Sequence, residues 1–339
     1  MTRPVARVVI AGAGVAGLTC ALALAKRGCH VEVFERSATL AGDACSRLAG
    51  GMLAPWCELE NAEPMVATLG VEAIAYWRAQ HPGTIQKGSL VLAQTRDLPE
   101  LDRFARRASH FERVDGDRIA ALEPALAGRF RQGLFFPQEA HLDPRQALPS
   151  LAQRLQEQGG KILLGNEIHV TQPPPAGADL LIDCRGLAAR DRLPDLRGVK
   201  GEMAMIRSAE ISLTRPVRLL HPRLPFYVVP RGGGLYMLGA TMVESDDRHR
   251  VTVQSLVELL NAAYALHPAF AQAQIVEIGG DARPAFSDNL PRIRRRGTTI
   301  SVNGLFRHGF LLAPALARLA TDVALDNAFY PEVMDEDHA

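Results

Sequence analysis

Three glycines near the start of the chain have the spacing of a dinucleotide-binding turn. Gly12, Gly14 and Gly17 follow the apolar run 8–10 within VVIAGAGVAGL. In such a turn the first glycine permits the tight bend, the second lets the backbone approach a pyrophosphate, and the third lets helix pack on strand. The N–H groups that begin the next helix attract phosphate. This spacing therefore predicts a nucleotide site.

A carboxylate completes the pattern at Glu35, at the end of the second predicted strand. An acid in this position accepts hydrogen bonds from ribose hydroxyls. The uncharged run 8–25, with basic residues on both sides, raises the alternative of a signal peptide or membrane anchor. The run consists largely of Ala and Gly and lacks the long Leu, Ile and Phe block that insertion requires. The ordered glycines and Glu35 favour the nucleotide site.

The composition argues against nucleic-acid and membrane partners. The 38 basic and 37 acidic side chains leave a net charge of +1, and no long run of one sign attracts a phosphate backbone. The cysteines are odd in number and scattered without metal-ligand spacing, which indicates a reducing compartment and no metal site. We therefore expect a cytoplasmic protein. Its cysteines are Cys20, Cys29, Cys45, Cys57 and Cys184.

Helix and strand patterns alternate early in the chain and become strand-rich later. They predict helices at 65–80, 98–107, 145–158, about 252–266 and 309–325, and strands at 84–93, 161–165, 180–186, 201–207 and 298–304, with a hairpin at 226–242. The βαβ pattern returns near 145–186, so the chain re-enters the nucleotide domain after an excursion. We expect an α/β fold. Its discontinuous Rossmann-like domain comprises 1–80, 138–200 and 285–335, interleaved with an α+β substrate domain, on an antiparallel sheet, at 81–137 and 201–284.

The densest basic cluster of the chain lies just before Gly297. Arg292, Arg294, Arg295 and Arg296 precede Gly297, and we expect them at a solvated hairpin tip.

The fingerprint alone does not separate NAD from FAD, but later blocks do. These are SRLAGGMLAP at 46–55, FPQEAHLDPRQAL at 136–148, YVVPRGGGLYMLGATM at 227–242, GDARPAFSDNLPRI at 280–293 and NGLFRHGFLLAPALA at 303–317. Together with the fingerprint, they resemble the flavin-dependent amine and amino-acid oxidases of the D-amino-acid oxidase superfamily, most of all the glycine oxidases of thiamin biosynthesis. The resemblance covers nearly the whole chain and implies FAD as cofactor and a homo-oligomer, a tetramer.

The resemblance also implies which residues contact FAD. A helix that begins near Gly309 would stabilise the negative charge of a reduced flavin. No cysteine follows Cys184 in the chain, so we expect the flavin to be bound without a covalent link. The implied contacts are Gly12, Gly14, Val15, Ala16 and Gly17 at the phosphate turn, Glu35 and Arg36 at the ribose, Cys45 and Ser46 along the pyrophosphate, Val170 at the adenine, Gly186 at a strand end, and Gly50, Gly51, Met52, Arg307, His308, Gly309, Phe310 and Leu311 around the flavin ring.

Substrate contacts follow from the same resemblance. Arg283 matches the arginine that binds the substrate carboxylate, a task suited to a planar, permanently charged guanidinium. Arg307 matches a second arginine near the flavin, and Tyr227 matches a tyrosine that assists at the carboxylate. Surface ion pairing is the alternative for each arginine, and core packing is the alternative for Tyr227 and the methionines. The remaining pocket residues are Met52 and Met242 as apolar walls and Ala54 as a small side chain facing the substrate.

Several positions depart from the family pattern and leave the substrate open. Cys45 stands in place of a hydroxyl residue, Asp183–Gly186 in place of a more apolar strand end, His308 in place of Asn and Pro225 in place of His. We expect FAD-dependent oxidation of glycine and small amines or D-amino acids by oxygen. The products would be an imine or glyoxylate, ammonia and hydrogen peroxide, with the imine supplied to thiazole synthesis. The alternatives are another amino-acid oxidase, a dehydrogenase of the superfamily, and a non-catalytic dinucleotide-binding protein.

Overall fold

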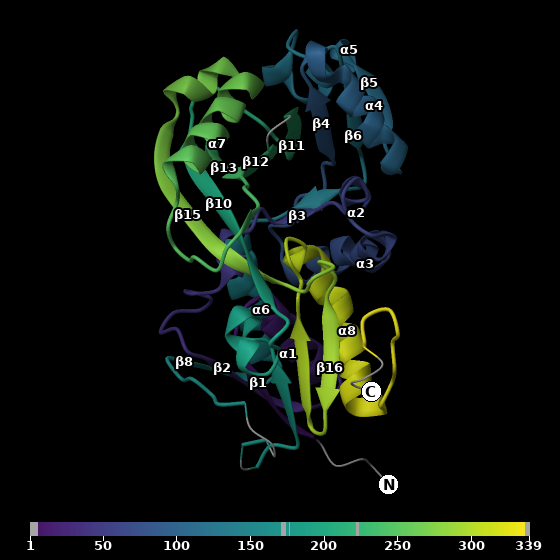
Figure 1. Cartoon of the computed structure of the whole chain (residues 1–339), viewed down its shortest axis with the longest axis vertical. Coiled ribbons are helices and arrows are strands. Elements are labelled where there is room, and N and C mark those ends of the chain that lie inside the picture. The colour runs from purple at the N-terminus through teal and green to yellow at the C-terminus, as the bar shows by residue number, and fades with distance from the viewer. Residues whose placement is uncertain (1–5, 171–173, 176, 222–223, 336–339) are drawn as a thin grey trace.

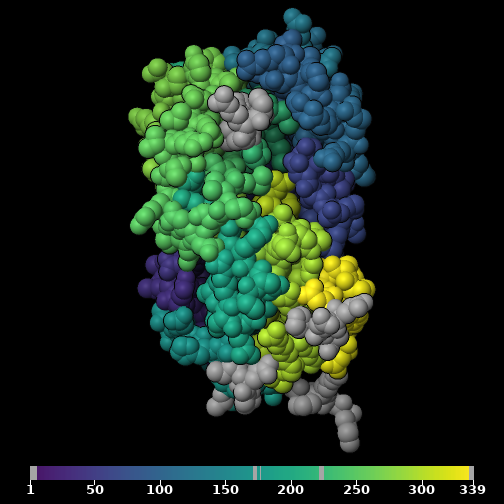
Figure 2. All heavy atoms as spheres, viewed as in Figure 1, coloured from purple at the N-terminus to yellow at the C-terminus, as the bar shows by residue number. Residues whose placement is uncertain are grey.

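The chain is built around two β-sheets, which lie in the lower and upper halves of Figure 1. The computed structural model describes residues 6–170, 174–175, 177–221 and 224–335. With every atom drawn, the two halves form one elongated body, and the blue and green segments lie side by side across its upper end (Figure 2). None of the described helices is long and apolar enough to cross a membrane.

The lower sheet runs in the order β16-β17-β9-β1-β2-β8 and is parallel except for the β16–β17 hairpin. Helices α1, α6 and α8 pack around this sheet, with α1 against both others, and a fourth helix, α3, packs on α8. Its strands are β1 Arg7–Ala11, β2 His30–Glu35, β8 Lys161–Leu164, β9 Leu180–Asp183, β16 Arg292–Arg296 and β17 Thr299–Asn303; its helices are α1 Val15–Lys26, α3 Pro64–Gln80, α6 Pro144–Glu157 and α8 Gly309–Asp326.

The upper sheet is mostly antiparallel, although β4 and β11 pair in parallel. Its strands are β4 Ser89–Ala93, β5 Glu112–Asp115, β6 Gln132–Phe136, β10 Arg197–Arg207, β11 Val217–His221, β12 Leu224–Gly232, β13 Leu235–Gly239, β14 Val243–Glu244 and β15 Gln274–Ala285. The helices of this half are α4 Leu98–Arg107, α5 Gly116–Leu122 and α7 Val253–Leu266.

Short elements connect the two halves. Strands β3 Met52–Leu53 and β7 Ala140–His141 form a two-stranded sheet. Helix α2 Pro55–Glu58 follows β3 in the chain. The 3-10 helices η1 to η5 lie at Cys45–Leu48, Thr95–Asp97, Pro124–Leu126, Gly186–Asp191 and Pro268–Gln272.

The predicted fold class is confirmed, with two local corrections. Of the strand expected at 84–93, only the part from Ser89 forms β4, and Ile85 makes an isolated bridge to His141. The strands of the lower sheet come from separate stretches of the chain, and the domain boundaries given above remain our proposal.

The arginines at 292–296 form strand β16, so the expectation of a solvated tip is wrong for Arg292 and Arg294. The Arg294 side chain is only 11% exposed and pairs with Asp195 and Asp335, while its guanidinium lies over the Phe286 ring. Arg292 also pairs with Asp335. Carboxylates distant in sequence pair with these two arginines, and composition alone does not show them.

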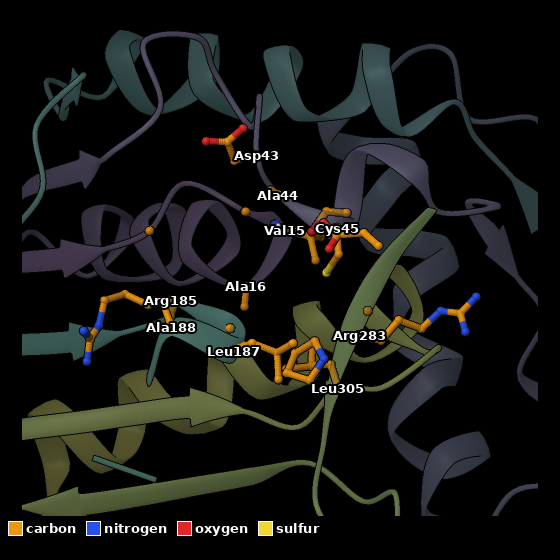
Figure 3. A pocket seen from close by; sticks show the side chains of 18 of the residues that line it. Val15, Ala16, Asp43, Ala44, Cys45, Arg185, Leu187, Ala188, Arg283 and Leu305 are labelled. Atoms are coloured by element: carbon orange, nitrogen blue, oxygen red, sulfur yellow. Dashed lines mark hydrogen bonds between the residues drawn. The ribbon is translucent and has the colours of Figure 1, made fainter. Parts of the chain in front are cut away.

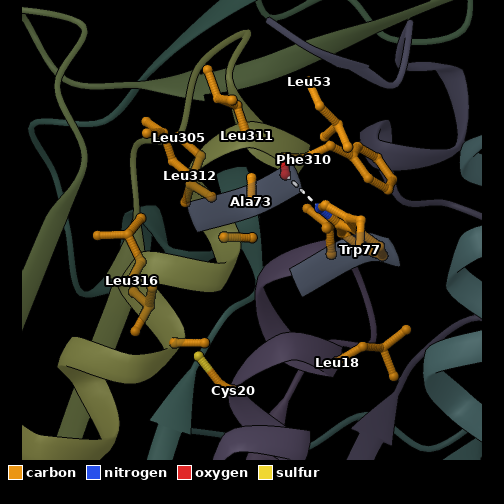
Figure 4. Packing of buried hydrophobic residues seen from close by; sticks show 14 of the residues in the cluster. Leu18, Cys20, Leu53, Ala73, Trp77, Leu305, Phe310, Leu311, Leu312 and Leu316 are labelled. Carbon is orange, nitrogen blue, oxygen red and sulfur yellow. Dashed lines mark hydrogen bonds between the residues drawn. The ribbon is translucent and has the colours of Figure 1, made fainter. Parts of the chain in front are cut away.

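A buried indole replaces a missing hydrogen bond in α8. Pro314 lies inside this helix and has no N–H to donate to the carbonyl of Phe310, four residues earlier. The Trp77 Nε1 donates to that carbonyl instead, at 2.7 Å (Figure 4). Trp77 is fully buried on α3, so this bond joins α3 to the first turn of α8.

Trp77→Phe should lower the free energy of unfolding by about 1–3 kcal/mol, because it leaves the buried Phe310 carbonyl without a donor. Adding Pro314→Ala supplies an N–H within the helix and should recover part of this loss. Urea unfolding of the two single variants and the double variant measures the coupling. Strictly additive effects would contradict the assignment.

A buried carboxyl group makes stability depend on pH. Glu139 accepts a hydrogen bond from the Cys57 N–H at 2.9 Å and contacts the Ser89 hydroxyl. Burial raises the pKa of Glu139 from 4.5 to about 7. Within this window the folded protein binds more protons than the unfolded chain, so the contribution of Glu139 to stability is lost as the pH rises.

Glu139→Gln removes the ionisation and should be more favourable at pH 8 than at pH 5. The change in the free energy of unfolding that this substitution causes should differ between the two pH values by about 1–3 kcal/mol. Urea unfolding at both pH values is the measurement, with the exposed Glu112→Gln as control. An equal effect of Glu139→Gln at the two pH values would show that the carboxyl group does not titrate in this window.

Candidate active site

A long cavity lies between the two halves of the molecule. It encloses about 1520 Å³, counting the open space at its mouth, and elements of both sheets line it (Figure 3). Its lining runs from the glycine turn and Glu35 to Tyr227 and Arg283, as an extended dinucleotide requires. A second cavity of about 390 Å³, also counting open space, adjoins it, and the two share Ala49, Gly50, Tyr227, Arg307 and Phe310.

The glycine turn has the close approaches that the fingerprint predicts. Gly12 has φ +99°, and a Cβ there would lie 2.8 Å from the carbonyl oxygen of Cys184. A Cβ on Gly17 would lie 1.8 Å from the carbonyl oxygen of Gly12. Because both positions exclude a side chain, the backbone forms the wall of the cavity here and α1 packs tightly behind it.

Glu35 is buried at the end of β2 and faces the same turn. Its Oε2 accepts from the Ala13 N–H at 2.8 Å, and its Oε1 accepts from the Ser37 N–H at 2.9 Å. Each carboxylate oxygen has a second lone pair, so ribose hydroxyls can still donate to it. The Ser46 hydroxyl accepts from the Val15 N–H at 3.2 Å and adds a polar group at the start of α1.

Two helices begin side by side at this cavity. Gly14 precedes α1, and Gly309 begins α8. A Cβ on Gly309 would lie 3.4 Å from Cγ1 of Val15. The first-turn N–H groups of both helices lack intrahelical acceptors and carry partial positive charge, so an extended anionic ligand fits between them.

Arg283 and Tyr227 lie together at the end of the cavity away from Glu35. Gly201 makes room for Arg283, because a Cβ there would lie 1.9 Å from Nη2. Nη1 donates to the Thr241 carbonyl at 3.2 Å. Burial lowers the pKa of Arg283 and raises that of Tyr227. No carboxylate within the described ranges pairs with Arg283.

Glu58 is a charged group of this site that the sequence analysis did not identify. This buried carboxylate contacts Arg218, lies 2.7 Å from Arg307 Nη2, and lies 3.0 Å from His308 Nε2. Burial acts to raise the pKa of Glu58, but the charges of Arg218 and Arg307 and the contact with His308 lower it well below its usual value. Burial also lowers the pKa of His308. Arg307 therefore shares the negative charge of Glu58 with Arg218.

The structure brings most of the expected cofactor residues together. The larger cavity is lined by Gly12, Gly14, Val15, Ala16, Glu35, Arg36, Cys45, Ser46, Gly50, Gly186, Arg307, Gly309 and Phe310, and the smaller one by Gly51, Met52, His308 and Leu311 as well. Burial raises the pKa of Cys45 to about 11, so its thiol is neutral.

Four expected residues lie outside these linings. Gly17 and Val170 are buried behind the wall, and Asn166, Glu167 and Ile168 line the cavity near Val170 instead. Ala54 is buried immediately before α2. Met242 is 47% exposed, with its sulfur 4.0 Å from Arg307 Nη1.

Other lining residues had no signal in the sequence analysis. They are brought to the cavity by segments that are far apart in the chain, and they include Asp43, Arg185, Leu187, Ala188 and Arg248. Arg185 is held by the fully buried Asp183 and by Asp191. Among the described residues, no group of three or more His, Cys, Asp and Glu side chains is placed to hold a metal ion.

Comparison with known proteins agrees with this geometry. The family model for FAD dependent oxidoreductases matches residues 7–323. A Rhizobium etli protein with the provisional name thiamine biosynthesis oxidoreductase ThiO is 55% identical over 312 residues, covering 92% of this chain and 94% of that protein. The glycine oxidase of Geobacillus kaustophilus is 27% identical over 360 residues, covering 93% and 92%.

Solved structures show the same fold. The glycine oxidase of Bacillus cereus has a TM-score of 0.80 at 23% identity, covering 96% of each chain. The iminodiacetate oxidase of Chelativorans sp. has a TM-score of 0.80 at 23% identity, covering 98% of each chain. The glycine cradle, the ribose-facing acid and the paired helix starts fit FAD, and the family match covers nearly the whole chain. The chain therefore belongs to the FAD dependent oxidoreductase family, and its cofactor is FAD.

Proposed function

We propose that the protein oxidises glycine and other small amines or D-amino acids with oxygen. Glycine, oxygen and water would give glyoxylate, ammonia and hydrogen peroxide, through an imine that can instead be passed to thiazole synthesis. The single observation that carries this proposal is Arg283, a partly buried guanidinium without a carboxylate partner among the described residues, beside Tyr227. The names of the thiamine biosynthesis and glycine oxidase relatives support the same reaction.

The two arginines of the site differ in their partners, and this difference separates their roles. Arg307 already pairs with Glu58 at 2.7 Å, so a substrate carboxylate gains little from it. Arg283 contacts only a backbone carbonyl among its described hydrogen-bond partners. A bidentate carboxylate would satisfy its remaining donors and its charge. Arg283 is therefore the group that selects amino acids over plain amines.

The remaining residues orient the substrate and restrict its size. FAD, when bound, supplies the acceptor for the hydrogen and the electron pair of the substrate Cα–H bond. Tyr227, whose pKa is raised, keeps its proton near neutral pH and can donate to the carboxylate. Met52 lies on the wall of the adjoining cavity with Glu58, Tyr227 and Arg307. We expect this site to admit a small Cα substituent and positioning to supply the main catalytic effect.

The proposal also covers the setting in which the enzyme works. We place it in the cytoplasm as a homo-oligomer, a tetramer, with oxygen as the electron acceptor. The experiment that tests the function is a steady-state assay of hydrogen peroxide production with glycine, sarcosine, D-alanine, D-proline and L-alanine. Glycine and sarcosine should be oxidised with the highest kcat/KM. The preference should be graded, because apolar pockets discriminate by only about 1–3 kcal/mol per methylene. Higher kcat/KM for bulky D-amino acids than for glycine would refute the substrate.

Arg283→Ala should lower kcat/KM for glycine by about 30-fold to several thousand-fold. The variant leaves the substrate carboxylate without its partner in a poorly solvated site, a loss of roughly 2–5 kcal/mol. Arg283→Lys should recover only part of the activity, because an ammonium cannot make the bidentate contact. A primary amine without a carboxylate serves as the control substrate and should be affected much less. Equal losses for both substrates would mean that Arg283 supports the fold and not recognition.

A further inference from the structure

Arg231 is a buried cation whose partners are backbone carbonyls. It lies near the end of β12, within the PRGGG segment, and its side chain is 3% exposed. Nη1 donates to the Leu142 carbonyl at 2.8 Å, and Nη2 donates to the carbonyls of Ala49 and Gly50 at 3.1 and 2.9 Å. Burying a charge in this way is costly unless many hydrogen bonds compensate.

The nearest carboxylate does not offset this cost. Asp143 Oδ1 lies 3.9 Å from Arg231 Nε, and the same oxygen accepts from the Arg145 N–H at the start of α6. Burial lowers the pKa of Arg231 to about 10, so the side chain remains charged near neutral pH. A cation held by three carbonyls stabilises one conformation of the backbone that supplies them, which here is the loop at 49–51 and Leu142 opposite it.

This contact alters the pairing between the loop and the strand beside it. β3 and β7 pair with Met52 opposite His141, which places Gly51 opposite Leu142. The Leu142 N–H donates to the Gly51 carbonyl at 2.9 Å. Among the described hydrogen bonds the reciprocal bond is missing, and the Leu142 carbonyl accepts from Arg231 instead. Gly51 itself has φ +67°, and a Cβ there would lie 2.2 Å from the Leu142 oxygen.

Two N–H groups are left without a protein partner. In a trans peptide the N–H points opposite to the carbonyl of the preceding residue. Because the carbonyls of Ala49 and Gly50 point at Arg231, the N–H groups of Gly50 and Gly51 point away from it. Within the described part of the chain, neither N–H has an acceptor. Both glycines line the cavities, and the Tyr227 ring packs against Gly50.

We propose that Arg231 is a positioning residue that holds the loop at 49–51 so that the N–H groups of Gly50 and Gly51 donate to the flavin ring. Donors fixed in this way stabilise negative charge that develops on reduction. The inference rests on the proposed function only for its kinetic readout, since the other readouts need FAD alone.

The test uses Arg231→Lys and Arg231→Met in the FAD-loaded protein, with Arg129→Met as the matched control. Arg129 also donates to a backbone carbonyl, that of Leu266 at 2.9 Å, at the end of α7 and outside both cavities. The equilibrium constant for reduction of the bound flavin should fall at least tenfold in both Arg231 variants. This fall lowers the two-electron reduction potential by about 30 mV. The Arg129 variant should match the unmodified protein. An unchanged potential in FAD-loaded Arg231 variants would overturn the proposal.

Kinetics and hydrogen exchange supply independent readouts. With glycine, the Arg231 variants should lose at least tenfold in kcat while KM stays within about twofold, since Arg283 is untouched. In the unmodified protein, amide exchange at residues 50–51 should slow when FAD is added to flavin-free protein. Unchanged exchange would contradict the proposal even if no variant folds. A protein that holds FAD but does not oxidise glycine would refute the proposed substrate and leave the potential and exchange readouts decisive for Arg231.

Discussion

The contact between the starts of α1 and α8 is the constraint on which the cavity depends. Gly309 lies close enough to Val15 that a Cβ would be 3.4 Å from it, so two helix N-termini face one space. Each carries about half a positive charge, and the two repel one another without an anion between them. The pyrophosphate of FAD and the charge of a reduced flavin relieve this repulsion. The fold therefore brings together the starts of two helices from opposite ends of the chain. An anionic cofactor stabilises this arrangement.

Four arginines around the other end of the site have different partners, and the partners determine what each can do. Arg218 and Arg307 share the carboxylate of Glu58. Arg231 is held by carbonyls, and Arg283 has a single carbonyl contact. Only Arg283 has both charge and donors available for a substrate carboxylate. Glu58 supplies one negative charge against two of these four guanidinium groups.

Local patterns in the sequence predicted the parts of the site that depend on local geometry. The glycine turn, Glu35 and the start of α8 each follow from a few adjacent residues, and the structure brings them to one cavity. The long helices were also predictable, because their apolar periodicity spans several turns. The solved relatives and the family match then confirm the fold class and FAD.

Long-range contacts were not predictable in the same way. Glu58 meets Arg218 across 160 positions of sequence, and Arg231 acts on a loop about 180 positions earlier. Nothing near Glu58 in the chain distinguishes it from a surface acid. The surface prediction failed for Arg292 and Arg294 for the same reason, because carboxylates that pair with them lie elsewhere in the chain. Met242 was expected as a wall of the pocket, and its exposure depends on how the segment after β13 leaves the sheet.

The most direct test of the account is the visible absorption spectrum of the purified protein before and after anaerobic addition of glycine. The account predicts the two-banded spectrum of oxidised FAD, loss of its long-wavelength band when glycine is added, and its return when oxygen is admitted. A flavin spectrum that glycine leaves unchanged would contradict the proposed substrate. A protein purified without flavin that cannot be loaded with FAD would contradict the assignment of the cavity itself.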